Sequence, residues 1–155
     1  MLAVAWVAIP RPKYQGLHEV EQLTADSLQS AVLSSAGPGD TTSTWLVMYA
    51  ASWNPSCDFV FQHFAELSAS YALSNLRFGW VDVGQWPEAA KVARVNDSAT
   101  AGCIPSFVLY VGGQEQCRLP RVGSDGKVKR VKFDKRGLEE YFALPRRHME
   151  LQASE

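Results

Sequence analysis

An aromatic side chain, an amide, a proline and a thiol lie within five consecutive residues, Trp53-Asn54-Pro55-Ser56-Cys57. An aromatic residue followed at a distance of four by a thiol, at the start of a helix, is the layout of a dithiol redox site, because a helix N-terminus favours the negative charge of a thiolate. In such a site the attacking cysteine would stand at position 54, where this sequence has Asn54. The chemistry that the pattern suggests is therefore thiol-disulfide exchange with its first nucleophile missing.

Two elements must position these residues. The near-continuous apolar run 45–50 predicts a central strand that is covered on both faces. After the turn, Asn54 is a good N-cap and Pro55 suits the first helical position, and apolar residues then recur at helical spacing through Tyr71. A buried strand that ends at a helix start needs no function, so this structural interpretation stands beside the redox one.

The composition excludes several classes of protein. The chain has 155 residues, 46% of them hydrophobic, with a formal net charge of -1, which fits one domain with a real core and gives no indication of nucleic-acid binding. Cys57, Cys103 and Cys117 form no Cys-x-x-Cys pair, and the three histidines have no metal-ligand spacing. We therefore predict no metal site, no cofactor and no disulfide framework.

The first sixteen residues form a separate segment. Residues 1–9 are wholly apolar and are followed by Pro10, two cations and Tyr14, which is the pattern at the exit of a membrane helix. Nine apolar residues are too few to cross a bilayer, which takes about 20. We predict that 1–16 is a membrane-proximal arm or the end of a membrane helix, with a buried first strand or a packed arm as the alternative.

The next part of the chain alternates between strand and helix patterns. Strands are predicted at 20–23, 45–50 and 78–83, and helices after the Thr24 cap, over 57–71 and from Pro87 to Val95. This order predicts an α/β fold with a parallel core and helices on both faces.

The pattern then changes. Pro105 introduces a strand over 107–111, and Gly112-Gly113 predicts a hairpin into a partner strand over 115–119. An added edge strand is predicted over 128–133, and a final helix is capped by Asp134. The predicted sheet is thus mixed, with a parallel core plus a C-terminal hairpin, and the Ile104-Pro105 bond is a candidate for the cis isomer.

Together these stretches resemble the thioredoxin superfamily. Residues 45–57 resemble its strand and active-site turn, Ile104-Pro105-Ser106 its cis-proline loop, and 135–142 its closing helix, so that the likeness covers roughly 20–145. It implies a thioredoxin-like fold, which we place at 17–145, with a polar C-terminal tail over 146–155.

Within the superfamily the sequence most resembles the thioredoxin-related transmembrane protein 2 group. The stretches that carry this likeness are 78–84, the long loop before Ile104, Gly112-Gly113 with Arg118-Leu119-Pro120, and 126–133. The group has a single cysteine in its active-site motif and a membrane helix ahead of the domain. The resemblance implies the endoplasmic reticulum membrane, with another organellar membrane as the alternative.

The resemblance implies a role for each matching residue. Cys57 matches the resolving thiol, Met48 stands where the family has a buried acid, and Trp53 and Pro105 match residues that shape the groove. We name Cys57 as the catalytic candidate, against its interpretation as a small core residue. The binding-groove candidates are Trp53, Asn54, Pro55, Ile104 and Pro105.

Two further features carry alternatives. Cys103 lies near Pro105 in the sequence, so that a disulfide with Cys57 across the groove is conceivable. Basic residues also cluster between 127 and 136, at Lys127, Lys129, Arg130, Lys132, Lys135 and Arg136. Such a run is usually a solvated edge, and its alternative is attraction to anionic lipid headgroups.

Two functions follow from these residues. The first is a redox-inactive module that binds protein partners through the Trp53/Pro105 groove, or forms part of a membrane complex. The second is a weak monothiol oxidoreductase or isomerase that uses Cys57. A glutathione-binding domain would additionally require a defined pocket near Asn54.

Overall fold

The structure is a computed structural model that describes residues 16–34, 43–98, 102–129 and 132–154. Its strands are β1 (Val20–Leu23), β2 (Thr44–Ala50), β3 (Leu76–Asp82), β4 (Ser106–Val111) and β5 (Gln114–Leu119). Its helices are α1 (Ala25–Ser27), η1 (Leu28–Leu33), α2 (Pro55–Tyr71), α3 (Pro87–Ala93), α4 (Lys135–Tyr141) and α5 (Leu144–Ala153).

The five strands form one mixed sheet in the order β1-β3-β2-β4-β5. β1, β3 and β2 run parallel, whereas β4 is antiparallel to β2, and β5 to β4. This is the predicted parallel core with a C-terminal hairpin. The α/β class and the thioredoxin-like fold predicted from the sequence are confirmed.

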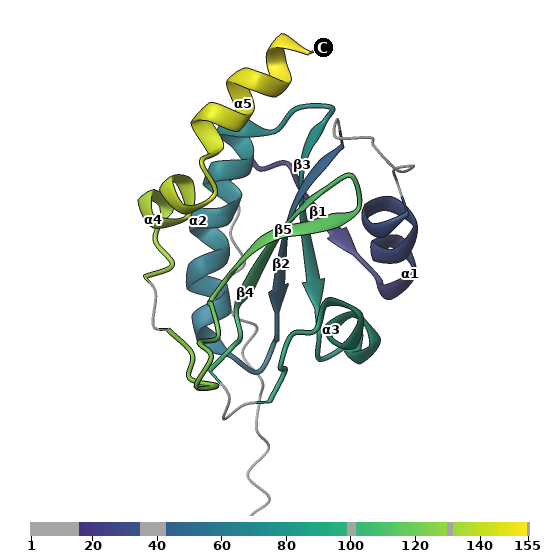
Figure 1. Cartoon of the computed structure of the whole chain (residues 1–155), viewed down its shortest axis with the longest axis vertical. Coiled ribbons are helices and arrows are strands. Elements are labelled where there is room, and N and C mark those ends of the chain that lie inside the picture. The colour runs from purple at the N-terminus through teal and green to yellow at the C-terminus, as the bar shows by residue number, and fades with distance from the viewer. Residues whose placement is uncertain (1–15, 35–42, 99–101, 130–131, 155) are drawn as a thin grey trace, which may run out of the picture.

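Helices cover both faces of the sheet (Figure 1). α2 and α4 lie on one face, where Phe64 of α2 packs against Phe78 of β3 and Phe107 of β4 at centroid distances of 5.5 and 5.3 Å. α1, η1 and α3 lie on the other face. Because both faces are covered, all seven residues of β2 are buried, as the apolar run predicted.

The predicted helix starts carry the predicted caps. Thr24 and Ser27 form a reciprocal capping box, the Asn54 side chain accepts a hydrogen bond from the Ser56 amide, and the Asp134 carboxylate accepts one from the Gly137 amide. Each cap satisfies amide groups that the first turn of a helix leaves without a partner. Local sequence therefore fixes where these helices begin.

Three segments differ from their predictions. The helix after Thr24 continues as a π-helix over Leu28–Leu33, in which the Ser34 amide reaches the Gln29 carbonyl five residues back. Of the edge strand predicted over 128–133, the described residues form only an isolated bridge between Val122 and Val128. Most of the stretch 146–155, predicted as a polar tail, forms the helix α5.

α5 exists because of tertiary contacts. Its buried residue Leu144 joins the core, and the Asn75 amide donates to the Leu151 carbonyl near its end. Most of the other residues of the helix are charged or polar, which is why the sequence alone predicts a polar tail. The predicted arm 1–16 lies outside the described residues, apart from residue 16 itself.

Among the described helices, none combines the length and the apolar character that a membrane span requires.

Candidate functional site

The turn after β2 is held by hydrogen bonds within the chain. The Asn54 amide donates to the Ala51 carbonyl at 3.1 Å, and the Cys57 amide donates to the Asn54 carbonyl at the same distance. The Asn54 side chain oxygen accepts from the Ser56 amide at 3.0 Å. Asn54 thus closes the turn and starts helix α2.

The other half of the Asn54 side chain reaches a second loop. Its Nδ2 donates to the Ile104 carbonyl at 2.8 Å, and the Ile104-Pro105 bond that follows is cis. The two segments, fifty residues apart in the sequence, are therefore tied together by the residue that replaces the attacking cysteine. Both polar ends of this side chain are used by the fold.

Cys57 lies in the first turn of α2 and points into the core. Cys57 is 5% exposed and belongs to the main hydrophobic cluster. Met48, at the position matched to the family's acid, is fully buried and pairs in register with Phe107, which contacts Phe64 of α2. The surroundings beneath α2 are apolar.

The cysteines are separate thiols. Cys57, Cys103 and Cys117 form no disulfide, so the conceivable bridge between Cys57 and Cys103 is absent. Burial raises the pKa of the Cys103 thiol, and the positive charge of Arg118 offsets part of this rise. A thiol with a raised pKa is a weak nucleophile near neutral pH.

The groove candidates differ in their access to solvent. Trp53 is 45% exposed and Pro55 is exposed at the start of α2, whereas Ile104 and Pro105 are buried. A shallow hollow lies beside the first two turns of α2, and its lining residues are Pro55, Ser56, Phe59, Val60, His63, Lys132, Phe133 and Asp134. The structure thus brings Asn54 against Ile104, and the open surface lies on the Trp53 and Pro55 side.

No cluster that could hold a metal ion occurs among the described residues.

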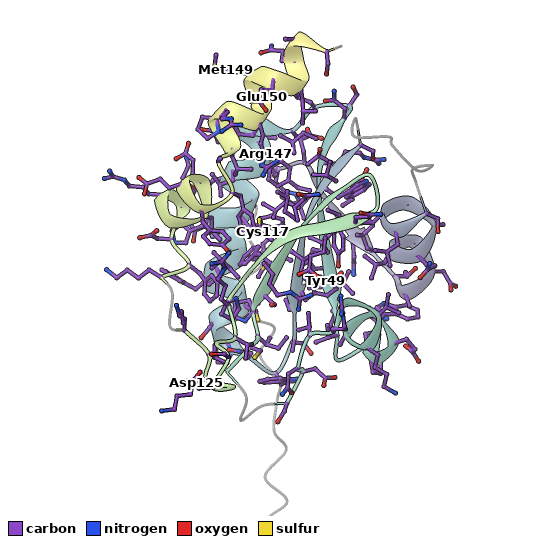
Figure 2. All side chains as sticks on the ribbon, in the orientation of Figure 1. Tyr49, Cys117, Asp125, Arg147, Met149 and Glu150 are labelled. Carbon is purple, nitrogen blue, oxygen red and sulfur yellow. The ribbon has the colours of Figure 1, made fainter. Side chains whose placement is uncertain are left out.

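The opposite face of the sheet holds a polar cluster that the sequence did not predict. The hydroxyls of Tyr49 in β2 and Tyr110 in β4 are 2.8 Å apart in the interior, where Figure 2 places Tyr49 among the strands. Burial raises the pKa of both phenols. Arg118 and Glu115 of β5 lie on this same face.

A β-bulge explains why Glu115 and Arg118 meet. Residues three apart in a regular strand point to opposite faces. Here the register shifts between Leu109 and Tyr110, so that Glu115 pairs with Tyr110 and Arg118 with Val108. Since Val108 and Tyr110 share a face, the bulge brings both charges to it.

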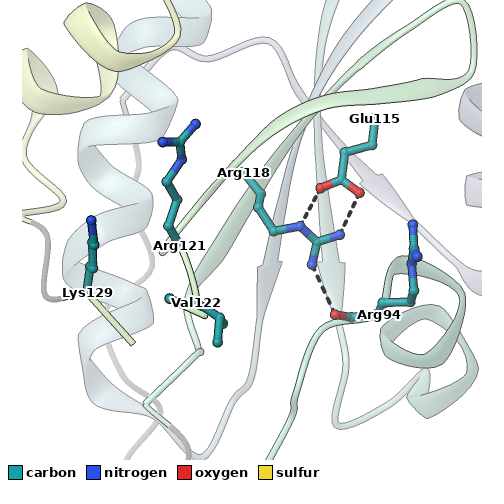
Figure 3. Close-up of a pocket in the computed structure, with 7 residues that line it drawn as sticks. Arg94, Glu115, Arg118, Arg121, Val122 and Lys129 are labelled. Atoms are coloured by element: carbon teal, nitrogen blue, oxygen red, sulfur yellow. Dashed lines mark hydrogen bonds and ion pairs between the residues drawn. The ribbon is translucent and has the colours of Figure 1, made fainter. Parts of the chain in front are cut away.

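Arg118 is fixed by four hydrogen bonds. Arg118 donates to the Glu115 carboxylate through Nε and Nη2, the second bond being 2.7 Å long, and to the Arg94 carbonyl at 3.0 Å (Figure 3). It also donates to the Ala93 carbonyl at 2.8 Å. The hydrogen bond from Arg118 is the main reason that the pKa of Glu115 is lowered. The pairing depends on the bulge, and no pattern in the sequence indicates a bulge at this point. The ion pair could therefore not be predicted from the sequence.

The comparisons with known proteins agree with the geometry. The sequence is 31% identical over 138 residues to the thioredoxin-related transmembrane protein 2 homolog of Drosophila melanogaster, covering 89% of this chain and 49% of that protein. It is 36% identical over 101 residues to thioredoxin-related transmembrane protein 2-B of Danio rerio, covering 65% and 33%. It is 27% identical over 133 residues to thioredoxin-related transmembrane protein 2 of Xenopus tropicalis, covering 86% and 45%.

No protein-family model matches the sequence. The chain spans between a third and about half of the length of these curated relatives. The resemblance to the thioredoxin superfamily, and within it to the thioredoxin-related transmembrane protein 2 group, is confirmed.

Proposed function

We propose that this domain is a thioredoxin-like binding module without dithiol chemistry. The observation that carries the proposal is the side chain of Asn54, which donates to the Ile104 carbonyl and accepts from the Ser56 amide. Reduction of a disulfide needs a thiolate that attacks and a second thiol that resolves the mixed disulfide. An amide that bridges two loops supplies neither.

The residues beneath the turn support the same proposal. Cys57 is nearly inaccessible at 5% exposure, and Met48 offers no proton to a resolving thiol. A dithiol exchange reaction would need both an exposed nucleophile and proton transfer at these positions. The remaining features, an exposed aromatic and a fixed proline loop, are suited to holding a partner in place.

The surface proposed for protein partners runs from Trp53 along the start of α2. Trp53 is 45% and Phe59 67% exposed, and Phe59 packs edge-on against His63 at 5.1 Å. Aromatic residues that remain exposed next to a hollow are enriched in protein interfaces. Because Pro105 itself is buried, we propose that the Trp53/Pro105 partner surface extends mostly along the α2 side.

The protein to which this domain belongs is proposed to be membrane-anchored. The relatives named above are called transmembrane proteins and are two to three times as long as the part matched here. The apolar residues 1–9 would lie at the end of the anchor. The endoplasmic reticulum stays the predicted membrane, which co-fractionation of the full-length protein with markers of each organelle would check.

Insulin reduction tests the redox part of the proposal. We expect the wild type and Cys57→Ser to match the protein-free control, because neither presents an attacking thiol. Asn54→Cys restores a Cys-x-x-Cys pair at the helix start and should raise the rate above that control. Activity in the wild type that disappears in Cys57→Ser would overturn the proposal.

Crosslinking tests the binding surface. A photoreactive amino acid at position 53 of the membrane-inserted protein should give discrete protein adducts. The same group at position 152, exposed on α5, is the matched control and should give none of those adducts. Identical adducts from both positions would mean that Trp53 does not mark the surface.

A monothiol oxidoreductase that uses Cys57 is the second candidate. The observation in its favour is that Cys57 lies in the first turn of α2, where the helix dipole favours negative charge. It predicts that the Cys57 thiolate attacks glutathione disulfide, which forms a mixed disulfide at Cys57 and releases one glutathione thiol. Mass spectrometry of the intact folded protein distinguishes it, since the binding module would show no adduct at this residue.

A further inference from the structure

Charge is divided unevenly along the chain. Residues 121–136 contain seven cations and two carboxylates, which give this segment a net charge of +5. Since the whole chain has a formal net charge of -1, the remaining residues together carry -6. A strongly basic segment on an otherwise acidic chain indicates a surface that attracts anionic partners.

The first part of this segment, 121–129, folds back on itself as a short antiparallel ribbon. The Lys129 amide donates to the Arg121 carbonyl at 3.0 Å, and the Gly123 amide donates to the Lys127 carbonyl at 2.8 Å. At the tip of the ribbon, the Asp125 carboxylate accepts a hydrogen bond from the Lys127 amide at 3.1 Å. These bonds place Arg121 opposite Lys129 and Gly123 opposite Lys127.

Three cations of the ribbon share one of its faces. Side chains that lie opposite each other in an antiparallel pair point to the same side, and so do side chains two residues apart in a strand. Arg121, Lys127 and Lys129 therefore lie on one face, and the bridge residues Val122 and Val128 lie on the other. Figure 3 shows the side chains of Arg121 and Lys129 next to each other and pointing in the same direction. All three cations are exposed, and we call them the basic face.

The base of the ribbon is held against α4. The Arg121 guanidinium lies 6.0 Å from the centre of the Tyr141 ring, and the Tyr141 hydroxyl donates to the Arg118 carbonyl at 2.8 Å. The basic face thus lies on the α4 side of the sheet. Arg94 lines the same pocket as Arg121 but lies across the Arg118–Glu115 pair in Figure 3, so it is not part of this face.

The acidic side chains of α4 are engaged elsewhere. Glu140 pairs with Arg136 at 2.8 Å, and Glu139 accepts a hydrogen bond from the Tyr71 hydroxyl. None of the ion pairs found among the described residues includes a cation of the basic face. The basic face therefore presents its positive charge to solvent.

We propose that the basic face docks this domain on the surface of a bilayer that contains anionic lipid. Cations that are spread along a ribbon, instead of converging on one point, suit a plane of many headgroups better than a single bound anion. The proposal rests on the membrane anchoring proposed above, which keeps the domain near a bilayer and raises the effective concentration of headgroups. An acidic protein is the other partner that such a charge attracts, and the experiment distinguishes the two.

Vesicle flotation of the full chain tests the proposal, with phosphatidylcholine vesicles that contain or lack phosphatidylserine. Binding to the neutral vesicles measures any contribution of the apolar residues 1–9, so the increase caused by phosphatidylserine isolates the effect of charge. We expect the partition coefficient to rise about tenfold or more in low salt, since each cation near an anionic bilayer contributes about fivefold. The increase should shrink in high salt because the charges are screened.

The variant Lys127→Gln with Lys129→Gln removes two cations of the basic face. Both side chains are exposed, and the hydrogen bonds of the ribbon come from the backbone, so the variant should fold. It should lose about tenfold of the binding to phosphatidylserine vesicles and keep its binding to neutral vesicles. The control, Lys91→Gln with Arg146→Gln, removes the same charge from α3 and α5 and should change the binding less than about twofold.

Three results would overturn the proposal. The first is equal binding to vesicles with and without phosphatidylserine; co-fractionation of the full-length protein with membranes would then show that the anchoring proposal still holds. The second is an equal loss of binding in the variant and the control, which would indicate general attraction instead of a face. The third is tighter binding to polyglutamate than to the anionic vesicles at equal concentrations of negative groups, which would assign the basic face to an acidic protein.

Discussion

Met48 and Tyr49 are neighbours in β2, and they face two chemically different halves of the molecule. Met48 points toward α2, where Cys57 and Phe64 complete an apolar layer. Tyr49 points to the other face, where Tyr110 meets its hydroxyl and Arg118 lies close enough to affect its pKa. β2 thus separates an apolar layer around Cys57 from a polar cluster that contains Tyr49, Tyr110 and Arg118.

The two halves handle their polar groups differently. On the α2 side, both the oxygen and the nitrogen of the Asn54 side chain form a hydrogen bond within the chain. On the α3 side, Arg118 is used in this way, whereas Arg94, Arg121 and Lys129 take part in none of the ion pairs found among the described residues. The Asn54 side chain thus joins two segments of the fold, and the cations without an ion pair lie away from it.

Arg118→Leu should have the largest effect on stability. It leaves the Glu115 carboxylate and the carbonyls of Ala93 and Arg94 without their donor, which we expect to cost about 3 kcal/mol. Urea unfolding followed by circular dichroism measures it. Arg136→Leu, which breaks an exposed pair with Glu140, is the control and should unfold close to the wild type. If Arg118→Leu unfolded at the same urea concentration as the control, the hydrogen bonds and ion pair of Arg118 would not stabilise the fold.

Alkaline pH should lower the free energy of unfolding through the buried phenols of the α3 side. Burial raises the pKa of Tyr49 and Tyr110 above the usual value of 10.0, so above pH 10 the unfolded chain loses protons that the folded chain keeps. The free energy of unfolding should therefore fall by about 1.4 kcal/mol per pH unit for each buried phenol, and stay level with respect to these groups below pH 10.

Tyr110→Phe sharpens this test. It should reduce the slope of the unfolding free energy between pH 10 and 11 by about one proton, measured by urea unfolding at each pH. An unchanged slope would mean that the phenols titrate alike in the folded and unfolded chain.

Asn54→Ala tests how much the two side-chain hydrogen bonds of Asn54 stabilise the folded protein. Loss of the helix cap and of the bond to the Ile104 carbonyl should together cost about 2 kcal/mol. Asn54→Ser keeps a capping oxygen but is too short to reach Ile104, and should cost about half as much. Thermal unfolding of the two variants separates the two contributions, and equal losses would show that only the bond to the Ile104 carbonyl matters.

Arg121→Gln combined with Lys129→Gln should have the smallest effect on stability. Neither side chain has an acidic partner among the described residues, so the change in unfolding free energy should stay below about 0.5 kcal/mol, in the stabilising direction if repulsion is relieved. Urea unfolding in low salt measures it. A large destabilisation would place these cations with Arg118 as structural residues.

The fold could be predicted largely because its signals are local. The buried strand 44–50, the caps at Thr24, Asn54 and Asp134, and the hairpin at Gly112-Gly113 follow from short patterns of residues. The predictions failed where tertiary contacts decide. α5 is a largely polar helix anchored to the body through Leu144 and Asn75. The stretch 128–133 has a strand-like composition, but its described residues form only the isolated bridge between Val122 and Val128.

The candidate site divides in the same way. Its residues Trp53, Asn54, Pro55, Cys57, Ile104 and Pro105 could be named from the sequence, and their roles in binding or catalysis stay predictions. The hydrogen bond from Asn54 to Ile104 could not be named, because it joins loops fifty residues apart.

The sequence by itself determined that the attacking cysteine and the buried acid are missing, since residue identity at positions 54 and 48 needs no structure. Only the tertiary structure decided that Asn54 ties the turn to the Ile104 carbonyl, that Cys57 is buried, and that Arg94, Arg118, Arg121 and Lys129 surround one pocket. The physical reason is that register and packing set these distances. A single bulge in β5 turns Glu115 and Arg118 to the same face, and no pattern in the residues of β5 predicts this bulge.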